Sequence, residues 1–118
     1  MTSPRRGEIY LVSFDPTIGH EIQKTRPALI IQNDISNRHS AITIVAAISS
    51  QFGDPPHPRE VVIPTGSKTG LSNPSAAILN QIRSIDRARL RKRVGAIDAA
   101  TMGRVDDAIK ISLGLVPL

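Results

Sequence analysis

The 118-residue chain contains no cysteine and no tryptophan, and aromatic side chains make up only 3% of it. Without cysteine, neither a disulfide framework nor a thiolate metal site can form, and the reducing cytoplasm is the expected compartment. The aromatic residues are Tyr10, Phe14 and Phe52. So few aromatic side chains exclude the kind of sheet surface on which RNA-recognition domains stack several bases.

The sequence also lacks a long apolar run. Its longest, residues 42–48, includes a threonine and has the length of a strand. A membrane-spanning helix needs about 18 or more apolar residues. The N-terminal residues carry charge but are not followed by the apolar segment of a secretory signal. We therefore expect no membrane partner, and the length predicts a single domain, residues 1–118, with one core.

Motifs for metal, nucleotide or serine chemistry are missing. There is no His-Glu-x-x-His segment, and the three histidines lie in separate polar segments, where we expect surface positions: His20, His39 and His57. Gly66 to Gly70 lacks the frame of a phosphate-binding loop, and no Gly-x-Ser-x-Gly elbow occurs. The sequence predicts neither a metal nor another cofactor.

Positive charge is in excess and unevenly spread. The net charge is +5, and residues 83–93 hold six basic side chains against one acid, Asp86. The basic residues are Arg83, Arg87, Arg89, Arg91, Lys92 and Arg93. Such a cluster attracts polyanions, and charge alone would suit nucleic acid, an acidic protein or a membrane surface, of which only the first two are expected as partners. A solvated face without a partner is the alternative interpretation.

The pattern of apolar residues predicts an α+β fold. Short β-branched runs indicate strands over residues 8–14, 28–32, 42–49, 60–63 and 76–85, with a sixth over 94–97. Turn-rich segments separate them at 15–27, 33–40, 50–58 and 64–75. A helix is expected from its N-cap Asp98 to a stop at Gly114, with an apolar stripe of Met102, Val105, Ile109 and Leu113. These elements favour a small, strongly bent antiparallel sheet or barrel packed on one helix, with Met102 and Val105 in the core.

The first loop and the end of the third strand carry the candidate chemistry. Residues 15–27 are too many for a tight hairpin and are polar, which favours a functional loop. Glu21 and Arg26 lie in it, and Ser49 and Ser50 follow the third strand. Cleavage of RNA needs no metal because the substrate supplies its own 2′-hydroxyl as nucleophile. Each donor directed at the developing oxyanion contributes roughly 2.7–4 kcal/mol.

Four blocks of sequence, in order, resemble the MazF/PemK-type toxins, the ribonuclease members of bacterial toxin–antitoxin pairs. They are Arg6 to Thr17, Gly19-His-Glu21 followed by Arg26-Pro27, Ile44 to Gln51, and Gln81 to Arg87. The resemblance extends from about Arg6 to Leu115. It implies an SH3-like antiparallel β-barrel with a C-terminal amphipathic helix, and a homodimer. It also implies an endoribonuclease (mRNA interferase) that cuts single-stranded RNA without a metal, leaving 2′,3′-cyclic phosphate and 5′-hydroxyl ends. An acidic cognate antitoxin is the implied inhibitor.

The resemblance also implies roles for individual residues. Arg26 and Ser49 are the catalytic pair, and Glu21 has a catalytic or positioning role. Gln81 contacts a base edge, and the RNA path includes Gly19, His20 and Gln51. Arg83, two residues after Gln81, is expected on the same face of its strand, where it can contact a phosphate. The family usually carries Thr at the position of Ser49, Gly at that of Lys24, and an acid at that of Asn80.

Alternatives remain open at the level of sequence. Arg26 stabilises charge and donates a proton to the leaving oxygen, or it is a structural arginine that binds loop carbonyls. Glu21 is the base, or it positions the loop; its reference pKa near 4.3 is low for a base. The whole chain could be a non-catalytic nucleic-acid-binding module of the same fold. A gyrase-inhibiting toxin is a third hypothesis, but such toxins depend on a Trp-Gly-Ile-type C-terminus, which this chain lacks.

Overall fold

The structure is a computed structural model that describes residues 2–14 and 25–117. The described residues form six strands and two α-helices. A short 3₁₀ turn, Arg87–Arg89, connects the last two strands. The strands are β1 (Glu8–Ser13), β2 (Thr25–Ile30), β3 (Ile42–Ser49), β4 (Glu60–Ile63), β5 (Ser75–Asp86) and β6 (Leu90–Ala96). The helices are α1 (Asp34–His39) and α2 (Ala99–Ser112). The α+β class predicted from the sequence is thus confirmed.

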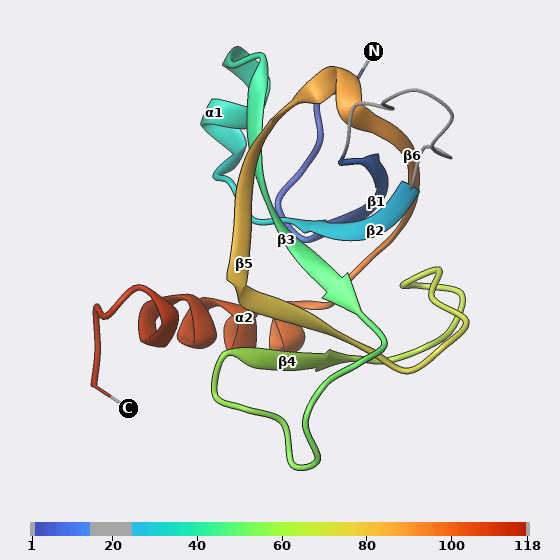
Figure 1. Ribbon diagram of the computed structural model, residues 1–118. Coiled ribbons are helices and arrows are strands. Elements are labelled where there is room, and N and C mark those ends of the chain that lie inside the picture. The colour runs from blue at the N-terminus through green and yellow to red at the C-terminus, as the bar shows by residue number, and fades with distance from the viewer. Residues whose placement is uncertain (1, 15–24, 118) are drawn as a thin grey trace, which may run out of the picture.

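The strands form one antiparallel sheet in the order β4-β5-β3-β2-β1-β6. Figure 1 shows β1, β2 and β6 curling around one end of the molecule, while β4 and α2 lie at the other end. Among the described residues no ladder joins the two edge strands, β4 and β6, so the sheet is not closed. The expected barrel is therefore not confirmed, and the structure shows a strongly bent open sheet.

Strand predictions hold best where apolar residues alternate. The predicted bounds of β3 and β4 match the structure, and β3 alternates between buried and less buried positions over much of its length. β6 begins four residues before its predicted start, so it also includes Arg91, Lys92 and Arg93. Their side chains are exposed on this edge strand, where charge is tolerated and discourages pairing with another chain.

β2 begins earlier than the sequence predicted and includes Pro27. A proline within a run argues against a strand because it cannot donate to the ladder. Here Pro27 faces Leu11 of β1, and the ladder between β1 and β2 continues through Arg26 to Thr25. Arg26, predicted to lie in a loop, is therefore placed on a strand of the sheet.

The prediction of a turn over residues 33–40 was wrong, because this segment contains helix α1. Asn33 caps it by accepting a hydrogen bond from the Ser36 backbone N–H at 2.8 Å. Asn37 is its one buried residue, and the hydroxyl of Thr43 donates to the Asn37 side chain at 2.8 Å. A helix this short, with a polar buried side chain, has no apolar stripe from which periodicity could reveal it.

Helix α2 was predicted correctly at both ends. Asp98 accepts a hydrogen bond from the Thr101 backbone N–H at 2.8 Å, and Gly114, with φ of 74°, follows the last turn. Val105 is buried in the core and Met102 packs against it, as expected. Leu113 differs from the prediction: it is 62% exposed, because the buried stripe runs instead through Thr101, Val105 and Ala108.

The loop between β4 and β5 crosses closely over β6. A Cβ on Gly95 would lie 2.3 Å from the Thr69 backbone, and one on Gly70 would lie 2.1 Å from the carbonyl oxygen of Val94. The backbone N–H of Ala96 donates to the Lys68 carbonyl at 2.9 Å. Only glycine permits the two backbones to come this close. The crossing brings Leu71 near the start of β2 and the end of β3.

Candidate functional site

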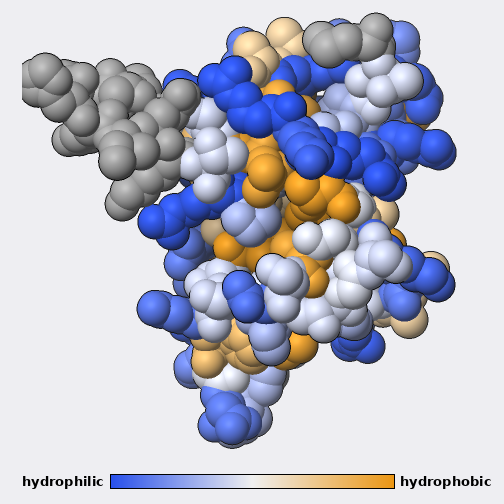
Figure 2. Space-filling model, turned by 90° about the vertical axis from the view of Figure 1, so that its right-hand side faces the viewer, coloured by the Kyte–Doolittle hydropathy of each residue, from blue (hydrophilic) through white to orange (hydrophobic). Residues whose placement is uncertain are grey.

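Two adjoining pockets open where β2 begins and β3 ends. Their volumes are about 600 and about 580 Å³, and they share five lining residues: Arg26, Pro27, Ile48, Ser49 and Gln51. The first pocket continues toward Leu11, Leu71 and Val94, and the second toward β5 and the loop before β4. Figure 2 shows apolar side chains gathered in the middle of the face that looks to the right in Figure 1, with hydrophilic side chains around them.

Strand register brings Arg26 and Ser49 together. β2 pairs with β3 through Ala28 and Ala47, and continuing this antiparallel register by two residues aligns Arg26 with Ser49. An even number of residues preserves the face of the sheet, so both side chains project on the same side. Both line both pockets. The structure thus juxtaposes the two residues that the resemblance named as a catalytic pair.

Arg26 and Ser49 each retain hydrogen-bonding capacity. The Arg26 side chain is exposed and makes no hydrogen bond or ion pair within the described parts of the chain, so the structural alternative, a guanidinium bound to loop carbonyls, has no support there. The Ser49 Oγ accepts a hydrogen bond from the Gln51 backbone N–H at 3.0 Å. Its own hydroxyl proton remains available for a ligand oxygen.

Gln51, Gln81 and Arg83 also converge on the second pocket. A register shift in the β3–β5 ladder, between the pairs Ala46–Ile82 and Ala47–Ile78, leaves residues 79–81 of β5 as a bulge. Gln81 is the last residue of this bulge, and Arg83 follows it opposite Val45. Gly19, His20 and Glu21 lie outside the described residues.

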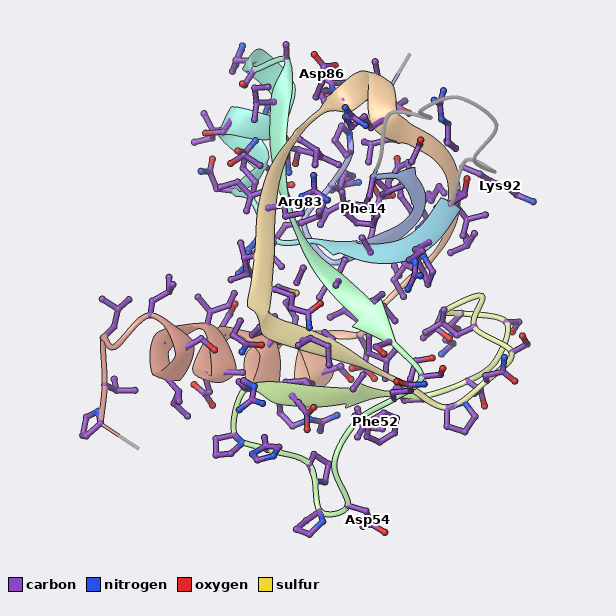
Figure 3. All side chains as sticks on the ribbon, viewed as in Figure 1. Phe14, Phe52, Asp54, Arg83, Asp86 and Lys92 are labelled. Atoms are coloured by element: carbon purple, nitrogen blue, oxygen red, sulfur yellow. The ribbon has the colours of Figure 1, made fainter. Side chains whose placement is uncertain are left out.

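Beside several apolar residues, four aromatic, charged or polar residues that the sequence did not single out as site residues line the second pocket: Phe14, Arg59, Glu60 and Asn80. The guanidinium of Arg83 lies 5.1 Å from the centroid of the Phe14 ring, and Figure 3 shows the two labelled side chains close together inside the curve of the sheet. One aromatic ring, that of Phe14, therefore lies at the site.

Glu60 fixes the loop that forms one side of the second pocket. Its Oε1 accepts hydrogen bonds from the backbone N–H groups of His57 at 2.8 Å and Gly53 at 3.1 Å. These two N–H donors, that of His57 first, hold the pKa of the Glu60 carboxyl below its usual value. Figure 3 shows this loop, with Phe52 and Asp54 labelled, extending away from the sheet beneath β4.

The basic cluster of residues 83–93 does not form one surface. Arg87 donates to the carbonyl oxygens of Asn37 and Ser40 at 3.2 and 3.4 Å, and Arg89 donates to those of Ser13 and Phe14, each at 3.1 Å. Arg93 pairs with Glu8. Arg83 lines the second pocket, whereas Arg91 and Lys92 are exposed on β6. The basic residues are thus divided among three situations: some form hydrogen bonds or an ion pair within the fold, one lines the pocket, and two are exposed on an edge strand.

The described residues contain neither a candidate metal site nor a candidate membrane-spanning helix. Within residues 2–14 and 25–117, no three His, Asp or Glu side chains lie close enough together to hold a metal ion. No helix in that part of the chain is long and apolar enough to cross a membrane.

Comparison with known proteins gives consistent results. Residues 5–113 match the family described as the PemK-like, MazF-like toxin of type II toxin–antitoxin systems. The chain is 40% identical over 112 residues to endoribonuclease EndoA of Bacillus subtilis, covering 95% of this chain and 96% of that protein. It is also 40% identical to endoribonuclease MazF of Staphylococcus saprophyticus over 111 residues, or 94% and 92% of the two chains.

Solved structures show the same fold at lower identity. A MazE–MazF crystal structure from Deinococcus radiodurans superposes with a TM-score of 0.80 at 24% identity, covering 98% of this chain and all of that one. A mycobacterial endoribonuclease in complex with its cognate antitoxin gives a TM-score of 0.78 at 22% identity, with 98% and 100% coverage.

Proposed function

The chain belongs to the PemK-like, MazF-like family of toxins from type II toxin–antitoxin systems, and on this basis we propose that it is an endoribonuclease that cuts single-stranded RNA. The observation that carries the proposal is the pair Arg26 and Ser49, aligned on neighbouring strands at pockets shared with Gln51. The relatives with 40% identity over most of their length are themselves named endoribonucleases.

The proposed reaction is an internal transfer at phosphorus. The 2′-oxygen of the RNA forms a bond to the adjacent phosphorus, and the bond from phosphorus to the 5′-oxygen breaks. The products are a 2′,3′-cyclic phosphate and a 5′-hydroxyl. A base must take the proton of the 2′-hydroxyl, and an acid must supply one to the departing 5′-oxygen. We assign the first task to Glu21, on the basis of the resemblance.

Arg26 and Ser49 act on the charge that develops at phosphorus. The Arg26 guanidinium donates hydrogen bonds to the negative oxygens of the phosphorane and stabilises them. The departing 5′-alkoxide is more basic than arginine, so Arg26 can also donate the proton that this oxygen needs. The Ser49 hydroxyl, with its proton uncommitted, donates to a non-bridging oxygen. No metal or other cofactor takes part in this scheme.

RNA is proposed to cross the second pocket. Gln51 and Gln81 carry amides that can bind base edges, and Arg83 beside Phe14 can bind a phosphate or a base face. Contacts of this kind determine which sequence is cut. If about four phosphates are neutralised, log affinity falls with log salt at a slope of about −3 for a single strand.

The second partner we propose is an acidic antitoxin. Structural relatives include toxins in complex with their cognate antitoxin, and the net charge of +5 favours an acidic segment. The resemblance also supports a homodimer, one toxin domain over residues 1–118, an SH3-like arrangement of the bent sheet, and action in the cytoplasm.

The experiment that tests the function uses purified protein and a long single-stranded RNA in excess EDTA, with Arg26→Ala alongside. We expect cleavage by the wild type alone, and end-group analysis should find cyclic phosphate and 5′-hydroxyl ends. Equal cleavage by both proteins would point to contamination or to a wrongly assigned site. RNA binding without cleavage would favour the non-catalytic binding module instead.

A further inference from the structure

Arg59 stands at the junction between the loop of residues 50–59 and strand β4, facing the second pocket. Its backbone is fixed from two sides. The Arg59 carbonyl accepts a hydrogen bond from the Leu79 N–H at 2.8 Å, which ties it to β5. The next residue, Glu60, holds the loop through the N–H groups of His57 and Gly53. The backbone of Arg59, from which the side chain extends, is therefore held in place much like that of a strand residue.

The guanidinium of Arg59, in contrast, makes no hydrogen bond or ion pair within residues 2–14 and 25–117. Its Nε is buried and finds no hydrogen-bond acceptor among the described residues. The other half-buried arginines of the described chain all donate to protein oxygens: Arg6 to Ile31 and Asp106, Arg87 to Asn37, and Arg89 to Ser13. A buried N–H group left unpaired is rare in proteins and requires an explanation. A ligand that supplies the acceptor is such an explanation.

The neighbouring acid, Glu60, acts on Arg59 only through the electrostatic field, since the Arg59 charge is one of the weaker causes that lower the Glu60 pKa. The Glu60 oxygen that bonds to protein is committed to the backbone of the loop, and no ion pair joins Glu60 to Arg59. The second pocket then contains three guanidinium groups, those of Arg26, Arg59 and Arg83, against this one engaged carboxylate. A site with this charge and with planar donors suits a phosphate, to which guanidinium groups bind through two parallel N–H groups.

We propose that Arg59 binds a backbone phosphate of the RNA, next to the phosphate that reacts at Arg26. The inference rests on the proposed function and extends it to a substrate-binding residue on the loop side of the pocket. Rotation about the terminal bonds of the side chain brings Nε and one terminal nitrogen to the same phosphate, so binding gives Nε the acceptor that it lacks. A phosphate contact contributes to affinity equally for all RNA sequences.

The test compares Arg59→Gln and Arg59→Lys with Arg38→Ala, a control on the exposed surface of α1 that lines neither pocket. Cleavage kinetics are measured on an RNA that the wild type cuts. The Kd is measured by fluorescence anisotropy over a series of salt concentrations, with the same RNA carrying a 2′-deoxy nucleotide at the cleavage position.

For Arg59→Gln we expect a KM and a Kd about ten-fold higher, with kcat within about two-fold of the wild type. The slope of log affinity against log salt should become shallower by about 0.7, the share of one phosphate. Arg59→Lys should keep the wild-type slope, because the charge remains, with an intermediate Kd. Arg38→Ala should match the wild type in every measurement.

Three results would overturn the inference: an Arg59→Gln variant that behaves like Arg38→Ala, a loss of affinity that depends on the base sequence, or a fall in kcat alone. If Arg59→Gln does not fold, the Arg59→Lys variant tests the inference instead. A Kd equal to that of the wild type would exclude bidentate binding of a phosphate by Arg59. A wild type that neither binds nor cuts RNA would instead refute the proposed function itself.

Discussion

The second pocket has two walls, which are held in place in different ways. The sheet wall consists of Arg26 and Pro27 on β2 and Ile48 and Ser49 on β3. The loop wall consists of Gln51, Arg59 and Glu60. Strand pairing fixes the sheet wall, and Leu29 of β2 and Ile48 of β3 belong to the buried core. The loop wall is held by the hydrogen bond from the Leu79 N–H to the Arg59 carbonyl and by one carboxylate, that of Glu60, bonded to two backbone N–H groups.

This difference matches the roles we propose for the two walls. Stabilising a transition state requires donors held in place before the reaction begins, and a sheet anchored in the core provides that rigidity. Contact with a flexible RNA strand tolerates more motion, so it can lie on a loop. The same contrast indicates that substitutions in the two walls have separable effects. Those in the sheet wall should lower kcat, and those in the loop wall should raise KM.

The largest effect is expected on the sheet wall. Arg26→Ala removes a charged donor aimed at the reacting phosphate and should lower kcat by roughly 10²–10³-fold. Because other arginines remain in the pocket, the Kd for an uncleavable RNA should rise much less. Single-turnover kinetics combined with anisotropy would separate the two effects. A parallel loss in binding and cleavage would show that Arg26 serves only to hold the RNA.

A smaller effect is expected on the loop wall. Glu60→Ala removes the acceptor for the N–H groups of His57 and Gly53, so the loop should loosen and KM should rise about three- to ten-fold. Kinetics at saturating RNA should show a nearly unchanged kcat. Glu60→Gln is the matched control, because its amide oxygen still accepts both bonds. An Ala variant with a normal KM would show that the loop holds its shape without this carboxylate.

A still smaller change is expected within the sheet wall for Ser49→Thr. The added methyl restricts χ1 while keeping the hydroxyl, so the donor should be better positioned. We expect kcat to increase by no more than about three-fold, with KM unchanged. Steady-state kinetics on one RNA would measure it. A loss of activity would mean that the methyl collides with a pocket lined by Ile48 and Pro27.

The smallest contrast concerns pH. Asp34, Glu60 and Asp98 accept backbone N–H bonds that lower their pKa values in the folded chain. Groups of this kind stabilise the fold above their unfolded pKa values, and that contribution is lost as the pH falls through the folded ones. The free energy of unfolding should therefore decline below about pH 5. Urea titrations at several pH values would measure this, and Glu60→Gln should show a weaker decline than the wild type.

Periodicity and capping allowed much of the fold to be predicted. β3, β4 and α2 were located from alternating apolar residues, from the N-cap at Asp98 and from Gly114. The missed element, α1, is a single short helix around the polar Asn37, and no apolar pattern marks it. The extension of β6 over Arg91 and Lys92 was missed because charged residues form a strand there only through pairing with β1.

The candidate site divides in the same way. Arg26 and Ser49 came from a family resemblance, and the β2–β3 register then placed them side by side. Arg59 carried no signal in the sequence: it follows a proline-rich segment and resembles any surface arginine. Its importance rests on an unpaired Nε in a pocket, which depends on where the carbonyl groups of other segments lie.

The sequence by itself determined the strand and helix types, the absence of thiol chemistry, the excess of positive charge and the family. These are properties of composition or of short windows, in which side-chain spacing and capping act locally. Only the tertiary structure decided that the sheet stays open and that the basic cluster is divided among three tasks. It alone also showed that a pocket arginine, Arg59, has a buried Nε with no hydrogen-bond partner in the described part of the chain. Such outcomes depend on register and on contacts between distant segments, which no local pattern contains.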